Sequence, residues 1–117
     1  MSQPKSRQSL ADVLADEFRQ ERAAALGRLG RALEGSLAAL ARFDAEQSQA
    51  ISVAECRQLR ASLVAEASRA LWHFVVQREA CGLRDMRYVL RDYRVPREVA
   101  AGMGALTREP LTPKRDP

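Results

Sequence analysis

Histidine, lysine, cysteine and aromatic residues are all scarce in this chain of 117 residues. His73 is the single histidine, and no cysteine or carboxylate stands three or four residues from it, the spacing that two metal ligands on one helix require. This excludes zinc fingers and di-iron helical bundles built within one chain. We therefore expect no metal and no cofactor, and the side chain of His73 is predicted to face solvent.

The two cysteines, Cys56 and Cys81, fall on one predicted helix, where 25 residues correspond to about 37 Å, so they cannot form a disulfide within it. Isolated thiols of this kind fit a reducing compartment. Cys81 is about 12 Å along the helix from His73, beyond the reach of a catalytic thiol–imidazole pair. The interpretation is two structural thiols, with Cys56 in the core, and a protein that is not an enzyme.

Long apolar runs are also missing. No segment approaches the roughly 18 apolar residues of a membrane-spanning helix, and the first ten residues lack the apolar centre of a signal peptide. We expect a soluble, cytoplasmic protein. Aromatic residues are only 5% of the chain and alanine supplies much of its 46% hydrophobic content, so large core side chains are few and self-association is expected.

The charge is positive but dispersed. Lysine and arginine total 19 against 15 acidic residues, a net charge of +4, yet no segment forms a basic block. Phosphate binding needs several cations on one face, so nucleic acid is not the expected main partner. The carboxylate pairs Asp12/Asp16 and Glu17/Glu21 are interleaved with arginine, which favours a solvated charged face over acid–base chemistry.

A first long helix is predicted over 9–46. Ser9 is its candidate N-cap, and Asp12 suits the positive end of the helix dipole. Two apolar stripes at helical spacing fail to join because Arg22 lies between them. Gly27 and Gly30 indicate either a bend or a small-residue surface for close packing, which we place at or near an interface. The stripes comprise Leu10, Leu14 and Phe18, and then Leu26, Leu29, Leu33, Leu37, Leu40 and Phe43.

A second long helix is predicted over 52–81. Ser52 and Glu55 have the spacing of a capping box, and Gly82 is a suitable residue for ending the helix. Its apolar residues form two separate faces, which predicts two neighbouring elements. The main face comprises Val53, Cys56, Leu63, Val64, Ala67, Leu71, Phe74 and Val75, and the narrower one Ala61, Ala65, Trp72 and Val76.

Two short helices are predicted after it, over about 86–93 and 96–103, with Asp85 as the N-cap of the first and Pro96 opening the second. We interpret them as a cap that packs over the end of the helix pair. Tyr88, Tyr93, Val95, Val99 and Met103 would cover the Trp72/Val76 face, and Arg78, Glu79, Arg84, Asp85 and Asp92 would form a charged network at the joint.

A helix-turn-helix that binds nucleic acid is the alternative for 86–103. Against it, Arg94 stands where that motif commonly has glycine, Leu90 is bulky at the helix crossing, and Gly102 and Gly104 end the recognition helix early. The residues that would meet phosphate are Arg87, Arg91, Arg94 and Arg97. A third hypothesis is a small-molecule or redox pocket around Trp72, Cys81, Arg84 and Tyr88.

The strings "LWHFVVQREACGLRD" and "YRVPREVAAGMG" resemble a family of small, all-helical bacterial proteins classed as a domain of unknown function. The resemblance covers about residues 9–104. It implies an all-helical fold and no particular activity, substrate or catalytic residue.

The sequence thus predicts an all-α protein with two long antiparallel helices, capped by the two short ones and pairing into a helical bundle. Residues 1–8 are expected to be a flexible N-terminus, 9–106 one helical domain, and 107–117 a flexible proline-rich tail. We expect a non-enzymatic protein-interaction or self-assembly module, most simply a homodimer. The candidate interaction or pocket residues are Trp72, Val76, Arg78, Cys81, Arg84, Asp85, Tyr88 and Tyr93.

Overall fold

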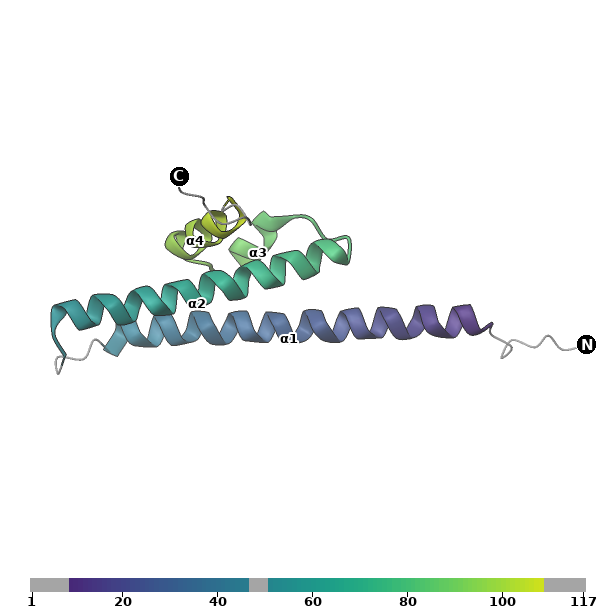
Figure 1. Ribbon diagram of the computed structural model, residues 1–117, viewed down its shortest axis with the longest axis horizontal. Coiled ribbons are helices and arrows are strands. Elements are labelled where there is room, and N and C mark those ends of the chain that lie inside the picture. The colour runs from purple at the N-terminus through teal and green to yellow at the C-terminus, as the bar shows by residue number, and fades with distance from the viewer. Residues whose placement is uncertain (1–8, 47–50, 109–117) are drawn as a thin grey trace, which may run out of the picture.

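The computed structural model describes residues 9–46 and 51–108, and these form four helices without a strand. The helices are α1 (Leu10–Glu46), α2 (Val53–Ala80), α3 (Met86–Asp92) and α4 (Arg97–Arg108) (Figure 1). The all-α architecture with two long and two short helices is confirmed. The predictions of flexible ends at 1–8 and over most of 107–117 lie outside the described residues.

The predicted start of α1 is confirmed. The Ser9 hydroxyl oxygen accepts a hydrogen bond from the backbone N–H of Asp12 at 3.1 Å, and Asp12 lies in the first turn. The helix is 37 residues long and continues through Gly27, Gly30 and Gly35. Gly30 serves close packing, because a Cβ built on it would lie 3.1 Å from the Tyr93 hydroxyl and 3.2 Å from Phe74. The contact is made within the chain, so Gly30 is not part of an outward interface.

Both ends of α2 are set by local signals. The Ser52 hydroxyl accepts from the Glu55 N–H at 3.0 Å and the Glu55 carboxylate accepts from the Ser52 N–H at 3.1 Å, which completes the predicted capping box. At the other end Gly82 adopts φ +86° and the Leu83 N–H donates to the Arg78 carbonyl at 2.8 Å. This is the Schellman arrangement that glycine favours.

The two long helices are antiparallel, with α2 level with only part of α1. The ion pair of Asp44 with Arg60 and the contact of Gly30 with Phe74 set the register. Each step back along α1 therefore matches a step forward along α2, and Ala80, the last residue of α2, lies level with about Ala24. The first third of α1 consequently extends past the end of α2, as Figure 1 shows.

The short helices form a layer on the other side of α2 from α1 (Figure 1). The Ser68 hydroxyl donates to the Val99 carbonyl at 3.1 Å, and a Cβ on Gly102 would lie 2.3 Å from that hydroxyl oxygen. α4 thus crosses α2 at contact distance through glycine. The core between the layers is formed by Leu33, Leu40, Ala67, Leu71, Phe74, Val75, Val89, Val99 and Met103.

Two predictions for this layer are corrected. The last helix ends at Arg108 and not near Met103, because Gly102 provides the crossing and does not end the helix. Asp85 is the N-cap residue of α3 by position, but its side chain makes no capping hydrogen bond. The turn at Arg94 does adopt the left-handed conformation, with φ +52°.

Candidate interaction surfaces

The predicted cover over the Trp72/Val76 face is incomplete. Val76 keeps 45% of its surface exposed, and Trp72 is half-buried, with its ring edge-on to exposed His73 at 5.2 Å between centroids. The reason is the position of α4, which packs on the Ser68 side of α2. Tyr88 stays exposed, whereas Tyr93 packs edge-on against Phe74 at 5.3 Å.

The predicted charged network at the joint is absent among the described residues. Arg78 instead lies over the rings of Phe74 and Tyr88, with its guanidinium carbon 5.9 Å from each centroid. A guanidinium loses little hydration on stacking against aromatic faces, which favours this arrangement. Asp85 pairs with Arg87 at 3.8 Å on the open surface. Arg84, Glu79 and Asp92 are exposed.

The thiols are less enclosed than predicted. Cys81 is half-buried as the C-cap of α2, with the Gln77 amide nitrogen 4.0 Å from its sulfur, and Cys56 is also half-buried and not a core residue. The residues of the pocket hypothesis are all half-buried or exposed, so they lie on a partly open end of the molecule: Trp72, Cys81, Arg84 and Tyr88.

Burial raises the pKa of the Tyr93 hydroxyl, and the nearby Glu34 carboxylate adds to the effect.

The four arginines of the nucleic-acid alternative are all exposed. Arg87 and Arg91 lie on α3, Arg94 in the turn, and Arg97 at the start of α4. Arg87 is already paired with Asp85. Val99 and Met103 are buried, so the face of α4 that carries them is the one packed against α2.

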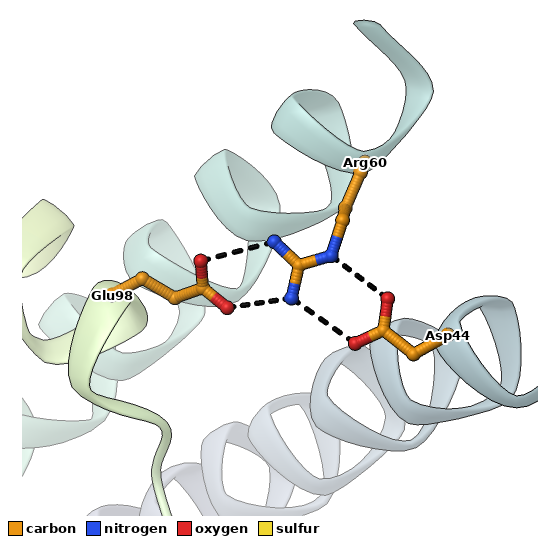
Figure 2. Close-up of polar contacts among 3 residues, drawn as sticks. All are labelled: Asp44, Arg60 and Glu98. Carbon is orange, nitrogen blue, oxygen red and sulfur yellow. Dashed lines mark hydrogen bonds and ion pairs between the residues drawn. The ribbon is translucent and has the colours of Figure 1, made fainter. Parts of the chain in front are cut away.

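Arg60 joins three helices, and local sequence patterns did not indicate it. Its guanidinium donates to Asp44 of α1 at 2.8 and 3.0 Å and to Glu98 of α4 at 3.0 and 2.6 Å (Figure 2). These hydrogen bonds lower the pKa values of both carboxyl groups and raise that of the guanidinium, the Glu98 bonds contributing most to the latter. Arg60 thus fixes α4 and α1 on the two sides of α2.

Beside this clamp lies an apolar groove of about 510 Å³ between α2 and α4. The small side chains of Ala61 and Ala65 lie on the α2 side, and both are exposed. Gly102 and Leu106 line the α4 side. We call this surface the α2/α4 groove. Ala61 and Ala65 belong to the predicted second face of α2, so the sequence did indicate part of it.

Two further arginines, Arg57 and Arg69, also line the groove. Both are exposed, and neither forms an ion pair with any residue that the structure describes. Arg60 is shared between two carboxylates, so the cluster of Asp44, Arg60 and Glu98 has a net charge of −1. Arg57 and Arg69 therefore provide the unpaired positive charge of the groove. The groove therefore combines an apolar floor with two available guanidinium groups.

The second unpartnered surface is the part of α1 beyond the end of α2, residues 10–23, which we call the arm. At 1.5 Å per residue it is about 20 Å long. Every residue in it is exposed or half-exposed. Its apolar side chains include Leu10 at 73% exposure, Leu14 at 43% and Phe18 at 63%, and these three, one helical turn apart, are the arm stripe.

The arm stripe does not continue the surface that α2 covers. At 3.6 residues per turn, its centre is rotated by roughly 100° from that of the stripe from Leu26 to Leu40. A helix that continued α2 end to end would pack against a different face of α1 and would not cover the arm stripe. A separate partner surface is therefore needed to cover these side chains.

A family of unknown function (DUF6665) matches residues 5–111. The chain belongs to this family. The match confirms the resemblance seen in the two sequence strings, and the family carries no assigned activity. No curated protein and no solved structure matches the chain.

The described helices include none that is both long enough and apolar enough to cross a bilayer. Within residues 9–46 and 51–108, no three histidine, cysteine or carboxylate side chains gather as metal ligands would.

Proposed function

We propose that this protein is a non-enzymatic self-association module that forms a homodimer through its arm. The exposed arm stripe carries the proposal. An isolated helix of this length is only marginally stable in water, and here helix formation propagates from the packed part of α1. The arm thus presents Leu10, Leu14 and Phe18 as a preformed helical face. Contiguous apolar side chains of this kind mark protein-interaction sites.

The energetics favour an assembly that buries two arms. Complete burial of a fully exposed large apolar side chain stabilises by about 1.5–3 kcal/mol. Because Leu10, Leu14 and Phe18 keep 73%, 43% and 63% of their surface exposed, burying one arm stripe contributes roughly 3–5 kcal/mol before any cost. Association costs about 4–15 kcal/mol in lost translational and rotational freedom. One buried arm only reaches the low end of this cost, whereas a dimer that buries both arms doubles the gain to roughly 5–11 kcal/mol for a single association cost.

Molar mass in solution across a dilution series tests the proposal. The wild-type chain is expected to be a dimer that dissociates on dilution. Replacing both Leu14 and Phe18 with glutamate should yield a monomer with unchanged helix content by circular dichroism. The matched control, Gln20→Glu with Ala23→Glu, adds two carboxylates to other faces of the arm and should remain a dimer. A wild-type chain that is monomeric at all concentrations would contradict the proposal.

Nucleic-acid binding through Arg87, Arg91, Arg94 and Arg97 is the second candidate, supported by the exposure of all four. Retention of random duplex DNA at low salt, reduced when Arg87 and Arg91 are replaced with glutamate, would favour it. No retention at low salt would remove it. The arm plays no part in this candidate, so the two experiments are independent.

A further inference from the structure

The arm stripe and the α2/α4 groove are two unpartnered surfaces of opposite character, one convex and the other hollow. We propose that the arm of a second copy of this chain docks in the α2/α4 groove. The inference rests on the self-association proposed above and identifies the surface that receives the arm. The large side chains of Leu14 and Phe18 would enter the groove and pack against its floor. Ala61, Ala65 and Gly102 form that floor.

The arm cannot reach the groove of its own chain. In the register of the long helices, Ala61 lies level with about Phe43, and Phe18 is 25 residues before Phe43 on a continuous helix. This separation is about 37 Å along the helix axis. Only another copy can supply the arm.

Charge supports the same pairing. At 100° per residue, Glu17 and Glu21 lie on the same face of the helix as the arm stripe. Asp12 and Asp16 lie on the opposite face. Glu17 and Glu21 are exposed and form no ion pair with any residue in 9–46 or 51–108. Two free carboxylates therefore accompany the apolar stripe, and the groove offers two free guanidinium groups.

The same carboxylates disfavour direct pairing of two arm stripes. Such a pair would bring Glu17 and Glu21 of both copies together at one interface. Like charges at an interface are a strong penalty against a partner, because each loses hydration without gaining an opposite charge. Docking in the groove places the same groups near Arg57 and Arg69 instead.

Reciprocal docking closes the assembly. Each copy has one arm and one groove, so a two-fold dimer in which each arm fills the partner's groove leaves neither surface free. Both contacts are then identical, and every substitution in the arm or the groove acts twice. The double contact permits a test by charge exchange.

Two charge-reversed variants provide that test: Glu17→Lys with Glu21→Lys in the arm, and Arg57→Glu with Arg69→Glu in the groove. Each variant alone faces like charges at both contacts, and its dimer should dissociate at concentrations at least about tenfold higher than wild type. Mixed in equal amounts, the two should form a heterodimer of near wild-type affinity, because both of its contacts join opposite charges. Molar mass of each variant and of the mixture is the measurement.

Matched controls carry the same charge changes elsewhere. Asp12→Lys with Asp16→Lys reverses the other face of the arm, and Arg87→Glu with Arg91→Glu reverses α3. Both should dimerise as wild type does. If the groove variant also dimerises as wild type while the arm variant does not, the arm binds another surface and the inference fails, although the proposed self-association stands. Failure of the mixture to restore the dimer would overturn it as well.

Cross-linking locates the contact directly in a background with Cys56→Ser and Cys81→Ser. A chain with Phe18→Cys, mixed with a chain carrying Ala65→Cys, should form a disulfide between the two chains on mild oxidation. Each single variant alone should form little. A disulfide between two Phe18→Cys chains would indicate arm-to-arm pairing and contradict docking in the groove.

Discussion

The two parts of α1 have similar residues and opposite environments. From Leu26 to Leu40 the apolar side chains face α2, and Leu33 is fully buried, whereas in the arm Phe18 keeps 63% of its surface exposed. Both parts are helical, with apolar residues every four positions in the arm and every three or four positions from Leu26 to Leu40. The comparison shows that an amphipathic pattern identifies a face to be covered, and that the cover depends on the length and register of the neighbouring helix.

The largest expected effect comes from matched truncations in the two parts. Leu33→Ala should lower the free energy of unfolding by about 3–5 kcal/mol, because it leaves a cavity in a closed core. Phe18→Ala should change it by less than about 0.5 kcal/mol. Urea unfolding, at concentrations where the chain is monomeric, measures both. Equal losses would show that the arm is packed within its own chain.

A pair of glycine substitutions distinguishes crossing positions from open ones. Gly102→Ala should destabilise by about 1–3 kcal/mol through overpacking, because its Cβ would lie 2.3 Å from the Ser68 hydroxyl oxygen, which is held by Val99. Gly35→Ala, with nothing within 4 Å, should stabilise by up to about 1 kcal/mol through helix propensity. Thermal unfolding of both variants gives the signs. A stabilised Gly102→Ala would mean that α4 does not cross α2 at this distance.

The Arg60 clamp should make the packed part of α1 sensitive to acid. Asp44 and Glu98 have pKa values lowered in the folded state, so their stabilisation is complete above the ordinary values of about 4 and is lost as the pH falls through the lowered ones. Arg60→Met should therefore lose less stability between neutral pH and pH 3 than wild type does. Unfolding at a series of pH values tests this, with Arg57→Met as the control that keeps the wild-type slope.

The smallest effect concerns two helix ends with the same hydrogen-bond pattern. After α2 the left-handed residue is Gly82, and after α3 it is Arg94, where the Val95 N–H donates to the Leu90 carbonyl at 2.9 Å. A side chain in this conformation costs about 1 kcal/mol. Arg94→Gly should therefore stabilise by up to about 1 kcal/mol, and Gly82→Ala should destabilise by a similar amount. Chemical denaturation measures both variants. A destabilised Arg94→Gly or a stabilised Gly82→Ala would contradict the shared geometry.

Local signals in the sequence predicted most of the helix ends. Ser9, the Ser52/Glu55 box and Gly82 all act on backbone groups within a few residues, so their spacing is sufficient to identify them. The end of α4 was predicted too early because a glycine in a helix has two uses. Gly102 allows a close crossing, and only the position of Ser68 distinguishes that use from helix termination.

The candidate surfaces were predicted only in part. The arm stripe and the Ala61/Ala65 face were visible as periodic patterns, and even the break at Arg22 was apparent. The Arg60 clamp joins residues 16 and 38 positions apart, and no local pattern relates them. Arg78 was predicted to join a charged network, and instead it lies over the ring of Phe74, one turn earlier on α2, and over the ring of Tyr88, which the fold brings to it.

The sequence by itself determined that the chain forms helices, where most of them begin and end, and which faces need cover. Capping and periodicity act within a turn or two, so a linear pattern encodes them fully. Only the tertiary structure decided that α2 ends level with Ala24, that α4 lies on the Ser68 side, and that the arm and the groove stay open. Those outcomes depend on register and on packing between segments far apart in the chain.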